Sequence, residues 1–339
     1  MLCNYSCLGK LFAFFGLYWI METDRRQLLA QVAFWYYVDG DSLATIAQRI
    51  NRSVSRASRL LQEARDENLV DIRIRFALHD DSTLARAIEK RFELTHATVF
   101  IGTVDSTSSS SLDQFGSRAA MAIDSHLDAA KTIATGWGAH VHAVINAVTP
   151  RLLCDGVVVQ ACGSIGATDS SMDGARLAHM LADQLGMQSR TLHAPLLLDN
   201  ASVAKALRTS PSIKQTLKVA QSADMTLMGL GSLDIARSGM HKAGFVTRKE
   251  LQNLKKEGSV GDLGGYHLSA NGSLLKHAFN ERVIGLTPSQ LKRMPGVVVI
   301  ATGLEKTDIL QAALKGGYIN HLITDQASAQ AVLESIATR

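Results

Sequence analysis

Hydrophobic residues between positions 51 and 69 recur with the period of an α-helix. The helix is predicted to begin at Val54, after Ser53, whose hydroxyl can accept a hydrogen bond from a backbone amide of the first turn. Its hydrophobic positions, spaced i, i+3, i+4 and i+7, are Ala57, Leu60, Leu61 and Ala64. Arg52, Arg56 and Arg59 share helical spacing on another side. The pattern predicts a helix that packs by one face and presents arginine on another.

A second, shorter hydrophobic stripe precedes this helix. It consists of Leu43, Ile46, Ala47 and Ile50. Ser42 can start a helix there, and residues 51–53 then form a short turn. Two helices joined by a short turn, the second bearing arginine, are typical of a helix-turn-helix that binds DNA. Leu69–Arg75 then alternates apolar and polar residues, which predicts a strand with a basic face, suited to act as a wing against the DNA backbone.

The polar side of the second helix carries the candidate DNA contacts. They are Arg52, Ser53, Ser55, Arg56, Ser58 and Arg59. Arginine can form paired hydrogen bonds with guanine in the major groove. Taken singly, the arginines could equally form a solvated charged face, but the preceding helix and turn favour operator DNA as a partner.

Two further helices flank this motif. Asp24–Val38 is predicted to support the two helices that follow, with its aromatic cluster Phe34–Tyr37 in the core and not on a base-stacking surface. Ser82–Phe92 is predicted as a helix that links two domains, within a linker at residues 80–96. The winged helix-turn-helix domain would therefore occupy residues 21–79.

The first twenty residues differ from the rest of the chain. Leu11–Ile20 is apolar and aromatic but has about half the length that a membrane helix needs. It follows Lys10 like a signal-peptide core, yet no small-residue cleavage site comes after it, and export would conflict with DNA binding. We expect residues 1–20 to be a non-native or disordered extension from an upstream start codon, with Met21 as the natural start. Recovery of peptides from residues 1–20 of the native protein would contradict this.

From about Ala97, short apolar runs alternate with helical patterns. The predicted strands are Thr98–Ile101, Lys131–Thr135, Val157–Gln160, Met225–Met228, Val297–Ala301 and Ile319–Ile323. The predicted helices are Leu112–His126, Val141–Val148, Met172–Leu185, Ile213–Ser222, Lys249–Lys256, Lys306–Lys315 and Asp325–Ile336. Such alternation predicts a mostly parallel sheet with helices on both faces, so residues 97–339 should form one α/β domain.

Glycine clusters follow four of the predicted strands. They are Gly136-Trp137-Gly138, Gly163-Ser164-Ile165-Gly166, Gly229-Leu230-Gly231 and Thr302-Gly303. In a parallel sheet these loops meet at the carboxyl edge, where ligands bind. Glycine lets backbone amides approach an anion closely. Tight turns would explain any one cluster, but several at one edge indicate a site for a small polar or phosphorylated ligand.

Composition changes this picture little. The 339 residues are 46% hydrophobic and 19% charged, as in an ordinary globular protein. The net charge of +4 is modest, and the clearest cluster of basic residues lies at residues 49–59. The cysteines show neither zinc spacing nor a disulfide framework, which favours a reducing cytoplasm. His241, His267 and His277 are scattered, and no metal or cofactor is expected.

From Met21 onward the chain resembles the SorC family of bacterial transcriptional regulators, the sorbitol- and deoxyribonucleoside-operon type. The N-terminal matches are Leu28-Leu29 through Tyr36-Tyr37, Ile46-Ala47 and Ser58–Arg65. The C-terminal matches are Gly136–Gly138, Ala194–Asn200, Ala223–Leu233, Gly258–Gly272, Arg282–Leu286 and Gly303–Asp325. The last three blocks, in this order, are highly specific.

The resemblance implies a winged helix-turn-helix joined to a Rossmann-like effector domain that resembles sugar-phosphate isomerases and deaminases. It implies a sugar or sugar-phosphate effector and a homo-oligomer, often a tetramer. The effector residues that it implies are Gly136, Trp137, Gly138, His140, Gly163, Ser164, Gly229, Gly231, Asp262, Gly303 and Lys306. Lys306 would contact a phosphate as a point charge.

Several roles in this site stay open. Asp262 could bind sugar hydroxyls or cap its loop, and His140 could contact the ligand or be a satisfied surface histidine; we favour contact for His140. His140 stands where the family commonly has a small hydroxyl residue, and Thr302 where glycine is usual, so phosphate and free sugar both remain candidates.

Two functions are consistent with the sequence. The first is a DNA-binding regulator of a carbohydrate-utilisation operon that senses its effector through the C-terminal domain. The alternative is a sugar-phosphate isomerase or deaminase, which needs positioned acids and bases. Asp234 and Asp262 are the only obvious acids near the glycine loops, and the DNA-binding head favours sensing, so no catalytic residues are predicted. No membrane partner is expected.

Overall fold

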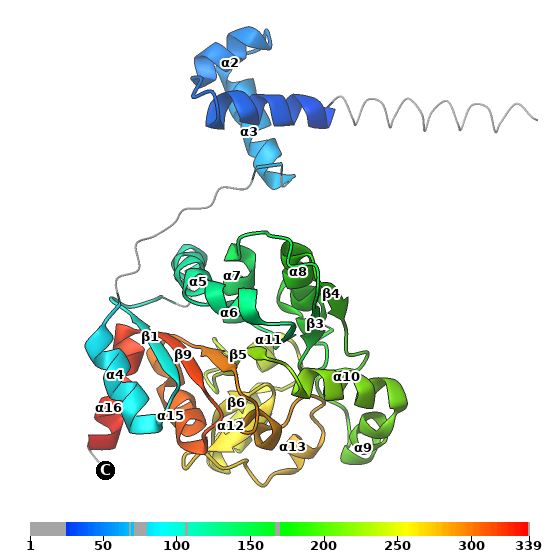
Figure 1. The fold of residues 1–339 in the computed structure, drawn as a ribbon, viewed down its shortest axis with the longest axis vertical. Helices are drawn as coiled ribbons and strands as arrows, with labels where there is room; N and C mark the ends of the chain where they lie inside the picture. Colours follow the sequence, from blue (N-terminus) through cyan, green and yellow to red (C-terminus); the bar gives the residue numbers. More distant parts are fainter. Residues whose placement is uncertain (1–24, 68, 71–79, 106–107, 167–169, 338–339) are drawn as a thin grey trace, which may run out of the picture. The chain divides into compact units, whose positions relative to one another are not determined.

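The computed structural model describes residues 25–67, 69–70, 80–105, 108–166 and 170–337 (Figure 1). The chain divides into two compact units, residues 1–74 and 75–339. Each unit has its own hydrophobic core. The predicted extension at residues 1–20 lies outside the described residues.

The first unit is built from helices. Residues 25–37 are helical, followed by α2 (Leu43–Arg49) and α3 (Val54–Asp66). The predicted stripe of α3 is fully buried: Ala57, Leu60, Leu61 and Ala64 pack against Leu29, Val32, Ala33, Ile46 and Ala47. Burial of this stripe is the main driving force for the unit, because isolated helices of this length are marginal in water.

The helix starts in this unit agree with the sequence. The Ser42 hydroxyl accepts a hydrogen bond from the Thr45 amide (3.1 Å), and that of Ser53 accepts one from the Arg56 amide (3.2 Å). Asn51 in the connecting turn has φ 51°, a left-handed conformation that asparagine tolerates better than most residues. Residues 71–75 of the predicted wing strand lie outside the described residues, while Leu69 and Val70 pack against the core.

The aromatic cluster of the first helix is divided between core and surface. Trp35, Tyr36 and Tyr37 are half-buried against the core, but the Phe34 side chain is exposed. The prediction of a core position is therefore wrong for Phe34. Four successive helical residues point in different directions around the axis, so they cannot all face one core.

The second unit is centred on a nine-stranded sheet (Figure 1). The strands are β1 (His96–Phe100), β2 (Thr132–Thr135), β3 (Val157–Gln160), β4 (Gln188–Arg190), β5 (Met225–Gly231), β6 (Ser259–Leu263), β7 (Tyr266–Ser269), β8 (Val297–Ile300) and β9 (His321–Asp325). The main path runs β1-β9-β8-β5-β2-β3-β4 and is parallel throughout, and β6 and β7 add an antiparallel hairpin to the end of β5.

Helices cover both faces of this sheet, in agreement with the predicted fold class (Figure 1). On one face lie α5 (Ser109–Ala122), α6 (Asp124–Ala129), α7 (Ala139–Ala147) and α8 (Gly174–Leu185). On the other lie α4 (Ser82–Phe92), α10 (Pro211–Gln221), α15 (Thr307–Gly316) and α16 (Gln326–Ala337). Strand β8 shows why: Val297 and Val299 enter one core, while Val298 and Ile300 enter the other.

Shorter helices complete the unit. They are α9 (Ala201–Thr209), α11 (Gly239–Lys242), α12 (Arg248–Lys256), α13 (Ala278–Glu281), α14 (Pro288–Leu291) and the 3₁₀ turns η1 (Ser170–Met172) and η2 (Leu304–Lys306). The predicted helix Leu112–His126 is divided at Ile123 into α5 and α6. Helix α4, expected within a linker, buries Ala85 and Ile88 in the core of the second unit.

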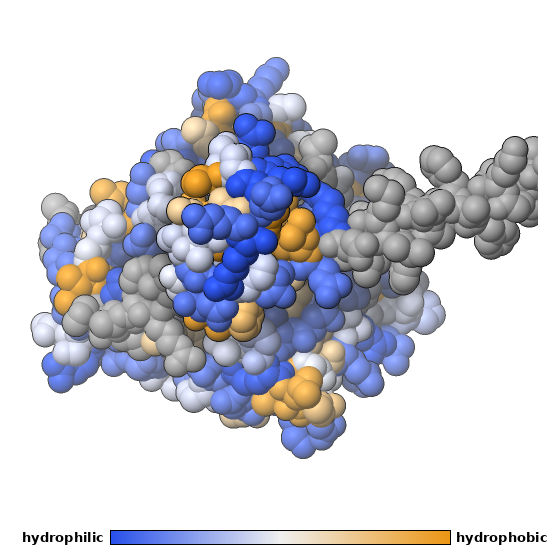
Figure 2. All heavy atoms as spheres, turned by 90° about the horizontal axis from the view of Figure 1, so that it is seen from above, coloured by the Kyte–Doolittle hydropathy of each residue, from blue (hydrophilic) through white to orange (hydrophobic). Residues whose placement is uncertain are grey.

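Every strand predicted after Ala97 is present, with ends shifted by up to a few residues. Strands β4, β6 and β7 were not predicted, because they are short and lack a continuous apolar run. Among the described residues, no helix has the length and apolar character needed to cross a membrane. On the face seen in Figure 2, hydrophobic residues form small groups among hydrophilic ones.

Candidate functional site

A cavity of about 560 Å³ opens at the carboxyl ends of the central strands. The chain leaves β2 towards β3 and β4 on one side and returns through β5, β8 and β9 on the other, so β2 and β5 form the switch point of the sheet. Open parallel sheets bind ligands at this point. The cavity is lined by the carboxyl end of β5, by residues that follow β2, β3, β5 and β8, and by Asp262 of the hairpin strand β6.

Most of the predicted effector residues line this cavity. They are Trp137, Gly138, His140, Gly229, Gly231, Asp262 and Lys306. A Cβ at Gly231 would collide with the Asp262 carboxylate, so glycine at this position lets Asp262 keep its place. The cavity therefore joins loops that are far apart in the sequence, as the sheet topology requires.

Four predicted residues are not in the cavity lining. The Gly136 amide donates to the Leu227 carbonyl (2.8 Å), and the Gly303 amide donates to the Ser328 hydroxyl (3.0 Å). Gly163 packs so closely on Pro195 that a Cβ would collide with its backbone, and Ser164 accepts a hydrogen bond from the Gln160 side chain (3.2 Å). These residues shape the loops around the cavity.

The structure adds lining residues that the sequence did not indicate. A segment after β5 contributes Ala236, Arg237, Gly239, Lys242 and Ala243. Glu305 adds a carboxylate, and Ile165, Met172, Met228 and Leu230 make part of the wall apolar. An apolar wall with a few charged groups is typical of sites for small polar ligands.

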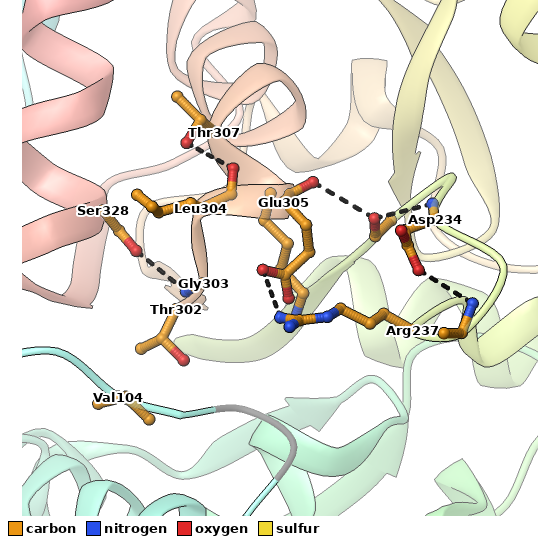
Figure 3. A network of polar contacts seen from close by, with 12 residues as sticks. Val104, Asp234, Arg237, Thr302, Gly303, Leu304, Glu305, Thr307 and Ser328 are labelled. Carbon is orange, nitrogen blue, oxygen red and sulfur yellow. Dashed lines mark hydrogen bonds and ion pairs between the residues drawn. The ribbon is translucent and has the colours of Figure 1, made fainter.

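An ion pair connects the segment after β5 to the turn after β8 (Figure 3). Arg237 Nη1 lies 2.7 Å from Glu305 Oε2, and the Ser232 hydroxyl donates to the Glu305 carbonyl (3.3 Å). The Ser232 hydroxyl also accepts the Asp234 amide (3.1 Å). These contacts hold one wall of the cavity to the turn that carries Lys306.

Lys306 belongs to a row of three buried polar side chains, with His140 and Thr302. Its Nζ donates to His140 Nδ1 (3.1 Å), and His140 Nε2 lies 2.9 Å from Thr302 Oγ1. Because Nδ1 accepts from the ammonium group, the imidazole proton resides on Nε2 and is donated to Thr302. Burial lowers the pKa of Lys306 to about 8, and burial together with Lys306 holds the pKa of His140 well below its ordinary value.

Asp262 caps its loop, one of the two roles considered from the sequence, and it also faces the cavity. Its Oδ2 accepts the Gly265 amide (3.0 Å), which caps the β6–β7 turn, and its side chain also lines the cavity. Burial raises its pKa to about 6, against the opposing effects of the Gly265 amide and Lys306. Asp262 and Lys306 thus bring an acceptor and a donor to the same cavity.

The outer side of α3 is a separate candidate surface. Arg52, Ser53, Ser55, Arg56, Ser58 and Arg59 are all exposed. Arg56 forms an ion pair with Glu63 (3.3 Å), and the Arg52 side chain donates to the Asn51 carbonyl (3.3 Å). Exposed contacts of this kind are weak in water, so DNA phosphates could replace them at small cost.

No group of three or more His, Cys, Asp or Glu side chains is placed to hold a metal ion within the described ranges. Cys154 is exposed and Cys162 is buried, and both are free thiols. The charged side chains that line the cavity, and can offer hydrogen bonds to a ligand, are those of Asp262, Glu305, Lys306, Arg237 and Lys242.

The fold and the cavity define an α/β unit with a candidate ligand site at the carboxyl edge of its sheet. Residues 77–334 match the family model described as "Putative sugar-binding domain", and the chain belongs to that family. The match covers nearly all of the second unit, including each residue of the cavity.

The similar proteins are transcriptional regulators, which confirms the resemblance to SorC-type regulators. The Deoxyribonucleoside regulator of Bacillus subtilis (strain 168) is 26% identical over 318 residues, 93% of this chain and 100% of its own length. Transcriptional regulator LsrR of Escherichia coli (strain K12) is 27% identical over 313 residues, 91% of this chain and 95% of its own. The full-length Sorbitol Operon Regulator SorC from Klebsiella pneumoniae is 26% identical, with a TM-score of 0.68 over 91% of this chain and 99% of its own.

Proposed function

We propose that the protein is a transcriptional regulator of a carbohydrate-utilisation operon, controlled by a sugar or sugar phosphate that binds in the cavity of the second unit. The observation that carries this proposal is the cavity itself, because Lys306, Asp262 and Glu305 meet there at the switch point of a sugar-binding fold. Sugar hydroxyls suit the carboxylates, and a phosphate suits Lys306.

The DNA-binding part of the proposal rests on α3. Its exposed side presents arginine and serine, and its opposite side is fixed in a hydrophobic core. We propose that Arg52, Arg56 and Arg59 contact operator DNA, together with Ser53, Ser55 and Ser58. The protein would act in the cytoplasm as a homo-oligomer, with a tetramer expected from the family, so that repeated half-sites are contacted together.

We propose that the cavity senses its ligand without turnover. Asp262 and Lys306 have shifted pKa values, which favours acid-base chemistry as a second candidate. The regulators to which the chain is similar support sensing instead. Incubation with sugar phosphates, followed by product analysis, tests the point: conversion that depends on Asp262 would favour the enzyme.

A thermal-shift screen of the full chain against free sugars, polyols and sugar phosphates tests the effector. A ligand that binds the folded state at 100 times its dissociation constant adds about 2.7 kcal/mol of stability. We expect a selective shift that Lys306→Met abolishes and that Lys256→Met, an exposed lysine of α12, retains. Absence of a shift with every compound would contradict the effector proposal.

The DNA contacts are tested with a site selected from random DNA. Arg56→Ala should weaken specific binding by about 1–3 kcal/mol at fixed salt if the arginine contacts a base. Arg293→Ala, which removes an equal charge from an exposed position of the second unit, is the matched control. Equal affinities of the two variants would contradict the assignment of Arg56.

A further inference from the structure

His140 connects the cavity to a buried hydroxyl. Its ring lies between Lys306 Nζ (3.1 Å) and Thr302 Oγ1 (2.9 Å), and only 6% of the residue is exposed. Lys306 is 8% exposed and Thr302 is fully buried. The imidazole is therefore shielded from bulk solvent on the Thr302 side and reaches a ligand only through the cavity that it lines.

In this arrangement the imidazole is neutral. Lys306 is the charged group that it contacts, and from α5 the Phe115 ring packs on it edge to face, with centroids 6.2 Å apart. The other charged groups on the cavity side are Asp262, Glu305, Arg237 and Lys242. Glu305 is paired with Arg237, and the hydrogen bonds of His140 among the described residues are with Lys306 and Thr302 and not with a carboxylate.

We propose that His140 takes up a proton when an anionic group of the effector binds beside Lys306, and that this exchange makes the site selective for effectors carrying a phosphate dianion over uncharged sugars. The proposal rests on the proposed function, because it concerns the same cavity. It assigns to His140 a second contact with the anion, in addition to that of Lys306.

The exchange follows from the donors and acceptors of the row. An anion within hydrogen-bonding distance stabilises a positive charge on a neighbouring base. When solvent supplies a proton to Nδ1, this atom changes from acceptor to donor, and the hydrogen bond from Lys306 to Nδ1 is lost. Lys306 can then direct its ammonium group to the anion, Nδ1–H donates to the same anion, and Nε2–H continues to donate to Thr302.

An uncharged sugar does not drive this exchange. Without an anion, protonation of His140 would place two positive charges about 3 Å apart in a buried site. A neutral ligand must therefore bind while His140 is neutral and one N–H of Lys306 is hydrogen-bonded to His140. A dianion gains a second charged donor, which is the physical origin of the proposed selectivity.

The other titratable groups limit the conditions of a test. With a pKa of about 8, Lys306 is mostly protonated at pH 7, so it can take up little further proton on binding. Asp262, with a pKa of about 6, is the competing site of proton uptake. Sulfate is a suitable probe because it stays a dianion throughout the range, and ribose 5-phosphate adds a sugar.

The experiment observes His140 itself in the full chain. Histidine labelled with ¹³C at Cε1 gives one NMR signal per imidazole, and the signal missing from His140→Gln is that of His140. Glutamine can still accept from Lys306 and donate to Thr302 but cannot titrate, so this variant is a matched control. Spectra are recorded from pH 5.5 to 8 with no ligand, with sulfate, with ribose 5-phosphate and with ribitol.

We expect the His140 signal to be constant without ligand and with ribitol, and to titrate within this range with sulfate or ribose 5-phosphate. Calorimetry at pH 7 in buffers of different ionisation enthalpy should give an uptake of several tenths of a proton, reduced at least threefold in His140→Gln. Loss of the uptake in Asp262→Asn, with uptake retained in His140→Gln, would overturn the proposal.

The failure of this proposal differs from that of the proposed function. If only an uncharged sugar gave a thermal shift, or if no anion gave one, the proton exchange would be overturned. Operator binding through α3 would be unaffected by either result. A His140 signal that stays neutral while an anion binds and depends on Lys306 would also overturn it, and would leave the effector site in place.

Discussion

At the scale of single residues, the candidate site is built at the expense of stability. Three side chains, those of Asp262, His140 and Lys306, are almost completely buried. Burial raises the pKa of Asp262 and lowers those of His140 and Lys306, which favours the neutral form of each. Such groups are retained where a ligand supplies the missing partner, and they cost free energy where it does not. The empty site should therefore gain stability when one of these charges is removed.

Asp262→Asn should stabilise the protein above pH 6. The carboxyl has a pKa of about 6 when folded and about 3.9 when unfolded, so its favourable contribution is complete below pH 4 and is lost as pH rises to about 6. A shift of about two units corresponds to about 3 kcal/mol as an upper estimate. Asparagine can still accept the Gly265 amide. Chemical denaturation at pH 4.5 and pH 7.5 measures the difference, and a variant effect equal at both values would contradict this account.

Substitutions at two glycines can distinguish residues that pack the loops from residues that contact the ligand. A Cβ at Gly163 would collide with the Pro195 backbone, so Gly163→Ala should cost about 1–3 kcal/mol of unfolding free energy. A Cβ at Gly229 would have its nearest neighbour at 3.7 Å, so Gly229→Ala should change stability by less than about 0.5 kcal/mol while reducing effector affinity. Denaturation and ligand titration of both variants test this. An equally destabilised pair would refute the distinction.

The sequence predicts the glycine residues of the cavity lining better than its charged residues. Gly138, Gly229 and Gly231 come within three residues of the ends of predicted strands, so a local rule places them at the carboxyl edge. Arg237 and Lys242 lie further along a segment whose path depends on tertiary contacts, including the ion pair with Glu305. No local pattern predicts that contact. The row from Lys306 to Thr302 is equally non-local, although each residue follows a predicted strand.

At the scale of elements, apolar runs predict the central strands well. Strands β3 and β8 consist largely of valine and isoleucine and are buried on both faces. Strand β4 has the sequence Gln188-Ser189-Arg190, and only its pairing with β3 at the sheet edge makes it a strand. The β6–β7 hairpin did carry a local signal: Gly264 and Gly265 have φ 60° and 90°, as a tight hairpin turn requires.

Glu305→Gln should loosen the cavity wall at residues 232–244 without unfolding the protein. The ion pair with Arg237 is partly exposed, with 37% of the arginine side chain accessible, so its loss should cost only about 0.2–1 kcal/mol. The backbone contact from Ser232 to the Glu305 carbonyl does not depend on the side chain. Hydrogen exchange should increase in residues 232–244. Glu257→Gln, which changes the carboxylate that lies 3.0 Å from His277 Nε2, is the control and should leave this segment unchanged.

At the scale of the whole molecule, sensing and DNA binding are assigned to units with separate cores. The first unit buries Leu29, Ile46 and Leu60 in one cluster, and the second buries its residues in others. Units that have separate hydrophobic cores can unfold as separate transitions. Communication between the two proposed functions then requires that effector binding in one unit change the free energy of DNA binding by the other.

Leu60→Ala should therefore destabilise one unit alone. The side chain is 2% exposed in the core of the first unit, so its truncation should cost about 2–5 kcal/mol there. Calorimetry of the full chain should show a lowered first-unit transition and an unchanged second one, with Leu181→Ala, in the core beneath α8, producing the reverse. An effector should raise only the transition that Leu181→Ala lowers, and specific DNA only the other, because each ligand stabilises the unit that binds it. A single transition that both variants lower equally would instead mean that the two units fold as one cooperative body.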